Sequence, residues 1–422
     1  MIPPISMAAS RDQALSALHD FLPKVPFYGQ RRNRVIPGHE DVSRLSGALR
    51  HRLIQESEIV DAVLHHHSFQ AGEKYLQEVL WRTYWKGWLE WHPSVWADYK
   101  HSLKAWHDGA DDHSQERAAA LMEGRSGVAI MDFFAQELTQ TGYLHNHSRM
   151  WWASFWIHVE RLPWYVGADF FMRHLCDADV ASNTLGWRWV AGLQTAGKSY
   201  LVRASNLRKY FEPSLLEAHQ AGLERLEDGV VEAWPAPYLN IPCVETLGRP
   251  TADLSRWVDR RVGWWVHPED GLADQKPLQK ANPVSVLCTS RVHETPGSSV
   301  SAPSTRYRHQ VADDVRQRVL SFMGSGDRVP TVEPSEHWME SLVQWASENH
   351  LEAVLAYRPF VGSIHDQMTD LEIQLETAGV AMVWVEREWT PPGFHTPKRA
   401  SSLFGSLPDN NFRPVRFPSH PR

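Results

Sequence analysis

Two carboxylates, an amide and two indoles stand close together between Asp177 and Trp189, and side chains of these types bind ligands or transfer electrons. Asp179 and Asn183 are four residues apart, so on a helix they lie on one face and could point to one ligand. From spacing alone, helix capping and solvation explain such polar residues better. The indoles of Trp187 and Trp189 suit stacking or electron transfer, although core packing also explains clustered tryptophans.

Three segments upstream add to this set. Residues 42–50, VSRLSGALR, place hydroxyls at a predicted helix start, where backbone amides suit a diphosphate. Residues 75–85, YLQEVLWRTYW, place a carboxylate three residues before a tryptophan, and residues 144–150 are LHNHSRM. In this order, and with residues 177–189, the segments resemble the flavin-binding core of the photolyase/cryptochrome family over about residues 20–225.

The resemblance implies FAD as the cofactor. It places Asn183 opposite the flavin N5, where an amide can accept or donate a hydrogen bond, and two acidic residues around the flavin ring. Val42 stands where the family usually has Thr, so one hydroxyl contact to the phosphates would be lost. The implied cofactor-binding residues are Tyr28, Ser43, Arg44, Leu45, Ser46, Arg149, Asp177, Asp179 and Asn183.

The same resemblance implies a site for damaged DNA. Glu78 would hydrogen-bond the base edge of a flipped pyrimidine dimer and Trp81 would stack on it; otherwise these two residues would be a surface carboxylate and a core indole. Asn146 and Met150 match the branch that repairs cyclobutane dimers rather than (6-4) photoproducts, whereas His147 replaces its usual Arg and would lose a guanidinium contact. The implied catalytic residues are Glu78, Trp81, Asn146, Met150 and, as a second stacking surface, Trp189.

Members of the family reduce their flavin through three tryptophans in series. Trp187 matches the first and Trp164 the second, and we expect both to transfer electrons. The third position falls on Leu121, so the surface end of the usual path is missing. An alternative exit could use the neighbouring Trp151, Trp152 and Trp156.

Hydrophobic periodicity predicts helices over most of residues 11–225, the first of them capped by Ser10 or Asp12. Helical spacing recurs at 42–58, 75–91, 131–138, 150–159, 169–175 and 212–228. Further on, strands are expected at 284–288, 351–357 and 380–385, and helices at 311–323, about 335–346 and 366–377. This alternation predicts a small parallel α/β layer.

We therefore expect a mostly α protein, with an all-helical photolyase-type FAD-binding domain at 10–230, a Pro- and Ser-rich connector at 231–305 and a small α/β domain at 306–395. In the family an α/β domain with a light-harvesting antenna precedes the flavin domain, but here the α/β domain would follow. It could be an antenna-like relic, a rearranged domain or an unrelated addition.

Composition narrows the class of protein. The net charge of −7 excludes an overall basic coat but allows a local basic groove for DNA phosphates. The three Cys are far apart, without CxxC, so neither a disulfide scaffold nor a four-cysteine cluster is expected, and no metal site is predicted. No signal-peptide or membrane-spanning segment stands out, so we expect a cytoplasmic monomer. Candidate groove residues are Arg31, Arg32, Arg34, Arg82, Lys86, Arg188, Lys198, Arg203, Arg208 and Lys209.

The function expected from these features is light-dependent repair of cyclobutane pyrimidine dimers in DNA by electron transfer from excited, reduced FAD. The alternative is a cryptochrome-like photoreceptor that binds FAD but repairs nothing. A nucleic-acid-binding protein that has lost its flavin is a third possibility, against which the set of Asp177, Asp179 and Asn183 argues.

Overall fold

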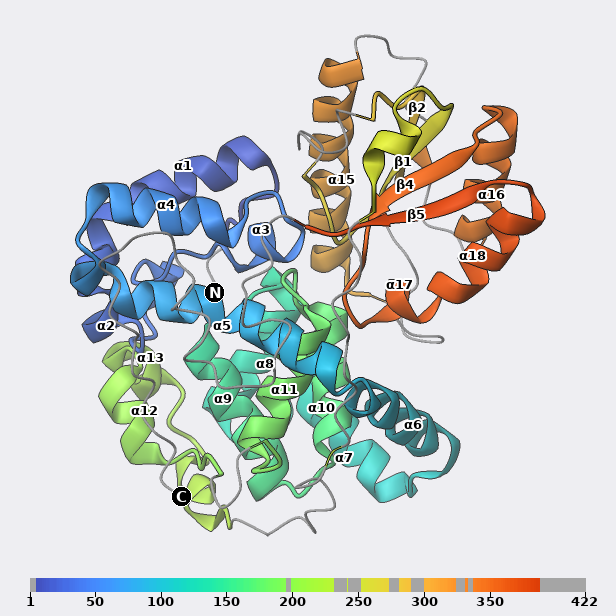
Figure 1. The fold of residues 1–422 in the computed structure, drawn as a ribbon. Coiled ribbons are helices and arrows are strands. Elements are labelled where there is room, and N and C mark those ends of the chain that lie inside the picture. Colours follow the sequence, from blue (N-terminus) through green and yellow to red (C-terminus); the bar gives the residue numbers. More distant parts are fainter. Residues whose placement is uncertain are drawn as a thin grey trace.

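Helices make up the first part of the chain, and strands alternate with helices in the second (Figure 1). The computed structural model describes residues 5–194, 199–230, 241, 252–272, 281–289, 300–323, 331–332 and 337–387. The predicted fold class, a helical domain followed by a small α/β unit, is confirmed. Among the described residues, no helix is both long and apolar enough to cross a membrane.

Within its described residues, the first part contains thirteen α-helices and several tighter or wider turns. The α-helices are α1 (Arg11–Phe21), α2 (Tyr28–Arg31), α3 (Ser46–Arg50), α4 (Glu56–His66), α5 (Phe69–Trp91), α6 (Ser94–Gly109), α7 (Asp112–Met122), α8 (Ala129–Thr141), α9 (Asn146–Ser154), α10 (Trp164–His174), α11 (Val180–Val190), α12 (Ala204–Tyr210) and α13 (Pro213–Ala218). Short 3-10 helices lie at Leu22–Phe27, Pro37–His39, Leu223–Asp228 and Leu254–Trp257, and α9 continues into a π-helical turn at Phe155–Val159.

Local signals explain several of these helix ends. Ser10 caps α1, as expected, by accepting a hydrogen bond from the Gln13 N–H at 3.2 Å. The helix expected over 212–228 is instead broken into α13 and a 3-10 turn. Gly222 stands at the break with a φ of 79°, and a Cβ there would lie 2.2 Å from the Gly127 carbonyl oxygen, so only glycine fits.

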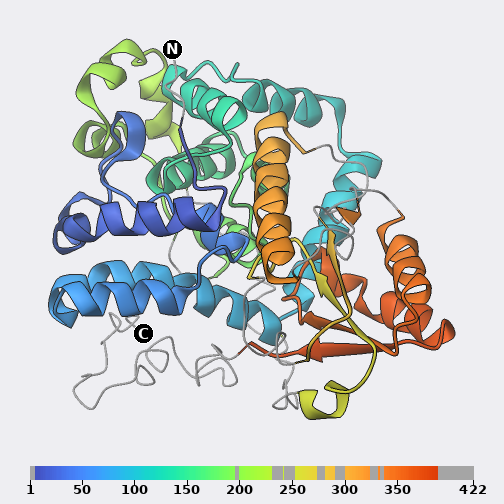
Figure 2. The ribbon, with the colours of Figure 1, turned by 90° about the horizontal axis from the view of Figure 1, so that it is seen from above.

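The second part is a five-stranded parallel sheet in the order β3-β2-β1-β4-β5. Its strands are β1 (Val262–Val266), β2 (Ser285–Thr289), β3 (Thr331–Val332), β4 (Ala353–Tyr357) and β5 (Ala381–Val385). Its helices are α15 (Ala302–Met323), α16 (Trp338–Glu348), α17 (Ser363–Asp366) and α18 (Met368–Thr377). In Figure 2 helix α15 covers one face of the sheet, and α16 and α18 cover the other.

The central strand β1 was missed by the sequence analysis. Its sequence, VGWWV, is buried at every position, because Trp264 packs toward α15 while Trp265 packs toward α16 and α18. Unlike the buried strands β2 and β4, β1 contains a glycine, Gly263, where a Cβ would lie 2.5 Å from the Trp345 ring, and a glycine inside a strand weakens its sequence signal. The sheet therefore begins at Val262 rather than near residue 306, inside the segment expected to be a connector. Residues 231–240, 242–251, 273–280 and 290–299 of that segment lie outside the described residues.

A shared hydrophobic core joins the two parts. Leu45 and Ile54 of the helical part belong to the same cluster of buried side chains as Trp264, Val311 and Leu355 of the α/β unit. Helix α15 also packs on α8 and α10. The α/β unit is therefore fixed against the helical part rather than tethered to it.

His51 lies at this junction, and we expect it to make stability depend on pH. Its Nδ1–H donates to the Pro268 carbonyl oxygen at 2.9 Å, and burial, followed by the nearby Arg50 and Arg308, lowers its pKa to about 3. Unfolded His51 takes up a proton below about pH 6.5, whereas folded His51 does not, so lowering the pH favours the unfolded chain. The buried His51 should therefore lower the free energy of unfolding by about 1.4 kcal/mol for each pH unit below pH 6.5.

Urea unfolding at several pH values between 7 and 5 measures this contribution. The slope of unfolding free energy against pH should be shallower in His51→Gln than in the wild type. The exposed His19 provides a matched control, because His19→Gln should keep the wild-type slope. Equal slopes in all three proteins would contradict the assignment to His51.

Candidate functional site

The loop between α10 and α11 positions the two carboxylates. Asp179 is the N-cap of α11, and its Oδ1 accepts a hydrogen bond from the Ser182 N–H at 2.9 Å. The capping expected from spacing alone is therefore present. The capping hydrogen bond uses only one carboxylate oxygen. Because the Asp179 side chain is only 2% exposed, its buried charge needs further partners.

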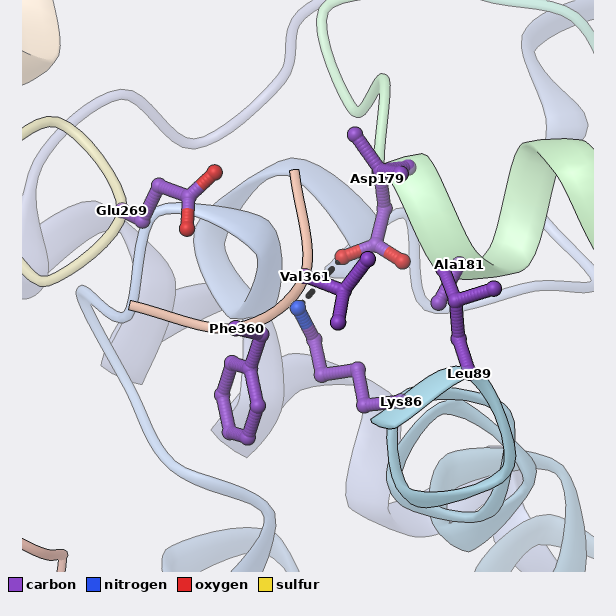
Figure 3. A pocket seen from close by; sticks show the side chains of 8 residues that line it. Lys86, Leu89, Asp179, Ala181, Glu269, Phe360 and Val361 are labelled. Carbon is purple, nitrogen blue, oxygen red and sulfur yellow. Dashed lines mark ion pairs between the residues drawn. The ribbon is translucent and has the colours of Figure 1, made fainter. Parts of the chain in front are cut away.

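Those partners are cations on helix α5. Oδ2 of Asp179 lies 2.6 Å from Nζ of Lys86 and 3.6 Å from Nη1 of Arg82 (Figure 3 shows the first pair). Burial would raise the pKa of Asp179, but Lys86, Arg82 and Arg50 hold it far below its ordinary value. Three cationic side chains thus surround one buried carboxylate, an arrangement suited to a further anionic group such as a diphosphate.

This placement corrects the expectation that Arg82 and Lys86 line a DNA groove. Both are turned inward, with side chains 12% and 11% exposed. The sequence contains a signal for this inward orientation. Charged residues recur every four positions and so form one stripe along α5, made of Glu78, Arg82, Lys86 and Glu90. Only the tertiary structure shows that this stripe is largely buried from Arg82 to Glu90.

Asp177 is bound to helix α9. Its Oδ2 accepts a hydrogen bond from Nη2 of Arg149 at 2.9 Å, and Nε of Arg149 donates to the Leu144 carbonyl oxygen at 2.7 Å. Burial raises the pKa of Asp177, but the pair with Arg149 outweighs burial and holds the pKa below its usual range. The predicted residues Asp177 and Arg149 thus form one ion pair between a buried carboxylate and a partly buried guanidinium.

Asn183 lies one turn into α11 and is almost fully buried. Its Nδ2 donates to the carbonyl oxygen of Ala168 on α10 at 2.9 Å, which sets the orientation of the amide. Asp179 and Asn183 therefore do not act as an equivalent pair. Asp179 is held by cations at the start of the helix, while Asn183 is held by the neighbouring helix.

The predicted phosphate-binding turn precedes the short helix α3. Arg44 has a left-handed backbone, with a φ of 55°, and Leu45 is buried, so the chain turns sharply before Ser46 begins the helix. Ser43 is partly buried in this turn. Tyr28, from α2, packs edge-on against Tyr75 of α5 with ring centroids 5.1 Å apart.

Several buried polar atoms near these residues make no hydrogen bond within the protein. Oδ1 of Asp177 and Nε1 of Trp187 are among them. Buried polar atoms normally have partners, so their presence points to a ligand with polar edges. Together with the cations around Asp179, these atoms fit FAD, which combines a polar ring system with a diphosphate.

The predicted lesion residues of α5 are only partly buried. Oε1 of Glu78 lies 2.5 Å from Nη1 of Arg32 and 3.0 Å from Nζ of Lys74, so its charge is already paired. Trp81 stacks on Trp85 with centroids 5.3 Å apart, and both rings are partly exposed. The helix therefore offers a carboxylate and an accessible aromatic surface next to its buried cationic stripe.

The remaining lesion residues lie on helices that pack against this one or each other. Asn146 is exposed at the start of α9, and its amide nitrogen lies 3.8 Å from the sulfur of Met150. Trp189 is partly exposed on α11, with Tyr200 at a centroid distance of 6.0 Å. Because α11 packs on both α5 and α9, the five predicted catalytic residues share one group of three helices.

His147 is not at the surface, contrary to the expectation that it replaces a lesion contact. It is buried and stacks on Trp151 at 4.3 Å. Nδ1 lies 3.0 Å from the Asn33 carbonyl oxygen, and Nε2 lies 3.2 Å from the Tyr200 hydroxyl. His147 therefore links α9 to two loops.

Four exposed cations lie on the two segments that a short backbone pairing joins, and one of them, Arg34, is paired with Asp41 at 3.3 Å. Val35 and Phe211 form an isolated parallel bridge, which joins the segment of Arg31 and Arg34 to that of Arg208 and Lys209. Arg188 is instead buried, Arg203 donates to backbone carbonyls, and Lys198 lies outside the described residues. Within the described ranges, no cluster of His, Cys, Asp and Glu could hold a metal ion.

The predicted electron-transfer residues lie in different aromatic surroundings. Trp187 packs against Phe171 and Trp152, at 5.1 and 6.1 Å. Trp164 packs against Tyr99 at 5.8 Å, and Tyr99 stacks on Trp96 at 5.0 Å. Leu121, at the expected third position, is buried, and so are the suggested alternatives Trp151, Trp152 and Trp156.

Replacing Trp187 by Phe is expected to abolish photoreduction of the bound flavin while leaving flavin binding intact, because Phe fills the space but is far harder to oxidise. Absorption spectra during blue illumination with a thiol donor measure this directly. Trp106→Phe, on α6, is the matched control. Wild-type reduction rates in Trp187→Phe would refute the path.

Comparison with known proteins adds independent information. Residues 75–215 match the family model described as the FAD binding domain of DNA photolyase. The deoxyribodipyrimidine photo-lyase of Escherichia coli (strain K12) is 33% identical over 186 residues, which cover 41% of this chain and 37% of the relative. That of Streptomyces griseus is 32% identical over 164 residues, covering 37% and 35%.

A solved structure, a bacterial class III photolyase from Agrobacterium tumefaciens, superposes with a TM-score of 0.40 at 22% identity over 51% of each chain. The matches to the photo-lyases of Escherichia coli and Streptomyces griseus span less than two fifths of the length of each relative. Glu78, Trp81, Asp177, Asp179 and Asn183 fall inside the matched residues, whereas Tyr28 and the turn at 43–46 precede them.

Proposed function

Since residues 75–215 belong to the family of FAD-binding domains of DNA photolyases, with FAD as the cofactor, we propose that this protein uses light to split cyclobutane pyrimidine dimers in DNA. When bound, reduced and excited FAD supplies the electron that opens the dimer and takes it back afterwards. The protein supplies binding, orientation and electrostatics. It acts as a deoxyribodipyrimidine photolyase on UV-damaged DNA.

The observation that supports this proposal is that helix α5 contains both the buried cations and the partly exposed residues expected to contact DNA. Arg82 and Lys86 turn inward to Asp179, where the cofactor would bind. Glu78 and Trp81 lie within one turn of Arg82 but remain partly exposed. A single rigid helix would therefore hold the cofactor near Arg82 and Lys86 and a flipped dimer near Glu78 and Trp81, which keeps donor and acceptor close.

The roles of the cofactor residues follow from the family resemblance. Asn183 would face the flavin N5, and the pair of Asp177 and Arg149 would border the ring. Arg82 and Lys86 would meet the diphosphate together with the turn from Ser43 to Ser46. On the DNA side, Glu78 would bind the base edge, Trp81 and Trp189 would stack, and Asn146 and Met150 would contact the lesion.

Repair of a dimer-containing oligonucleotide by the photoreduced protein tests the proposal. The flavin spectrum is recorded first, and the same mixture kept in the dark is the control. Loss of dimers in the light alone is expected. Bound and reduced flavin without any loss of dimers would reject repair and favour the second candidate.

That second candidate is a blue-light photoreceptor of the cryptochrome type, in which the flavin responds to light but no lesion is repaired. The buried His147 favours it, because this position provides no surface cation where the dimer-repairing branch has Arg. DNA binding, and hence the repair function, is favoured by four exposed cations, Arg31, Arg34, Arg208 and Lys209.

A further inference from the structure

The parallel sheet reverses the direction of its connections between β1 and β4. From β1 the chain proceeds to β2 and β3 on one side, and then crosses to β4 and β5 on the other. The loops that follow β1 and β4 therefore leave the same edge of the sheet side by side. In open α/β sheets this is the point at which ligands bind.

In this protein the two loops meet the helical part instead. The N–H of Val361, after β4, donates to Oε1 of the buried Glu90 on α5 at 2.6 Å. Oε1 of Glu269, after β1, lies 3.2 Å from Nη2 of Arg50. The Glu90 carboxylate of the helical part thus accepts from the Val361 N–H, a donor that a ligand at a switch point would otherwise use.

Phe360 of the same loop covers Lys86. The ammonium nitrogen of Lys86 lies 4.6 Å from the centre of the Phe360 ring and 2.6 Å from Oδ2 of Asp179. The guanidinium of Arg387 lies 4.7 Å from the same ring. Figure 3 shows Phe360, Lys86, Asp179 and Glu269 around one pocket of about 240 Å³, which includes space open to solvent.

The position of Lys86 matters because Asp179 begins the helix that contains Asn183. An ammonium group has three donors on a flexible stem, so it holds one geometry only when its surroundings confine it. The aromatic face attracts the cation and excludes water from it. If the ring were absent, Lys86 could turn to solvent and leave the Asp179 cap short of its closest cation.

We infer that Phe360, and through it the C-terminal α/β unit, positions Lys86 on Asp179 beside the proposed FAD site. The inference rests on the cofactor of the proposed function and is independent of DNA repair. It gives the α/β unit a role in the cofactor site.

Titration of the full-length apoprotein with FAD tests this inference in three variants. Phe360→Ala should weaken FAD binding about tenfold and change the visible spectrum of the bound flavin, as expected for loss of a desolvated cation–π contact. Phe360→Tyr keeps the aromatic face and should restore both the affinity and the spectrum. Melting temperatures of the apoproteins identify any variant that fails to fold.

Asp366→Asn is the matched control for docking of the two parts. Asp366, on α17, binds Lys100 at 2.7 Å and the indole N–H of Trp96 at 2.9 Å, so it joins the same α/β unit to α6. Its replacement should leave FAD affinity unchanged. If Phe360→Ala bound FAD as tightly as the wild type, the role of Phe360 would be overturned while the cofactor assignment stood. The same conclusion would follow if Phe360→Ala and Asp366→Asn weakened FAD binding equally. A wild-type protein that binds no FAD would overturn the cofactor assignment as well.

Discussion

Replacing Asp179 by Asn is expected to lower the free energy of unfolding by about 3–5 kcal/mol, the usual cost of leaving a buried charge without its partner. The carboxylate lies 2.6 Å from the buried Lys86 ammonium, and burial already lowers the pKa of Lys86. Urea unfolding of the apoprotein at pH 7 measures this loss. Flavin binding should fall as well, because the cap of α11 loses its cationic partner.

Two further variants show whether the loss of stability comes from the unpaired buried charge. Asp179→Asn combined with Lys86→Met removes both charges, so it should recover part of the stability but not the flavin binding. Asp366→Asn breaks the partly exposed pair with Lys100 and should cost less than about 1 kcal/mol. If Asp179→Asn were no more destabilising than Asp366→Asn, the buried pair would not be a determinant of the fold.

Replacing Trp81 by Ala is expected to weaken binding of dimer-containing DNA by roughly 1–3 kcal/mol, which is about 5- to 150-fold. The partly exposed indole, backed by Trp85 at 5.3 Å, would lose the face on which an extruded dimer stacks. FAD content should stay at the wild-type level. Affinities for damaged and undamaged oligonucleotides at one salt concentration, measured together with repair rates, test this.

Trp81→Phe retains an aromatic face and should keep most of the discrimination between damaged and undamaged DNA. Trp106→Ala, which removes another partly buried indole on α6, should change neither affinity. Binding to undamaged DNA should also be unaffected in Trp81→Ala, because phosphate contacts govern it. Equal affinity of Trp81→Ala and Trp81→Phe for the dimer would exclude Trp81 as the stacking surface.

Much of the fold could be predicted because its signals are local. Ser10 caps α1 as expected, and the apolar segments at β2, β4 and β5 lie within about a residue or two of their expected bounds. Strand β1 was missed because Gly263 interrupts its apolar run, and this glycine is needed because Trp345 packs against it. The break at Gly222 depends on the approach of Gly127, nearly a hundred residues away.

The candidate site divides in the same way. Asp177, Asp179 and Asn183 could be identified from their order along the chain, and the family match covers them. The inward orientation of Arg82 and Lys86 could not, because isolated cations on α5 would prefer solvent. The burial of His147 likewise depends on Asn33 and Tyr200, which the sequence places far from it.

The sequence by itself therefore determined the helical class of the first part, the alternation of the second, and the similarity of residues 75–215 to the FAD binding domain of DNA photolyase, because periodicity and ordered motifs are local properties. Only the tertiary structure decided which charges are buried, since an ion pair such as Lys86 with Asp179 forms only after two helices pack. It also decided that Phe360 reaches Lys86, a contact between residues far apart in sequence that depends on docking of the α/β unit.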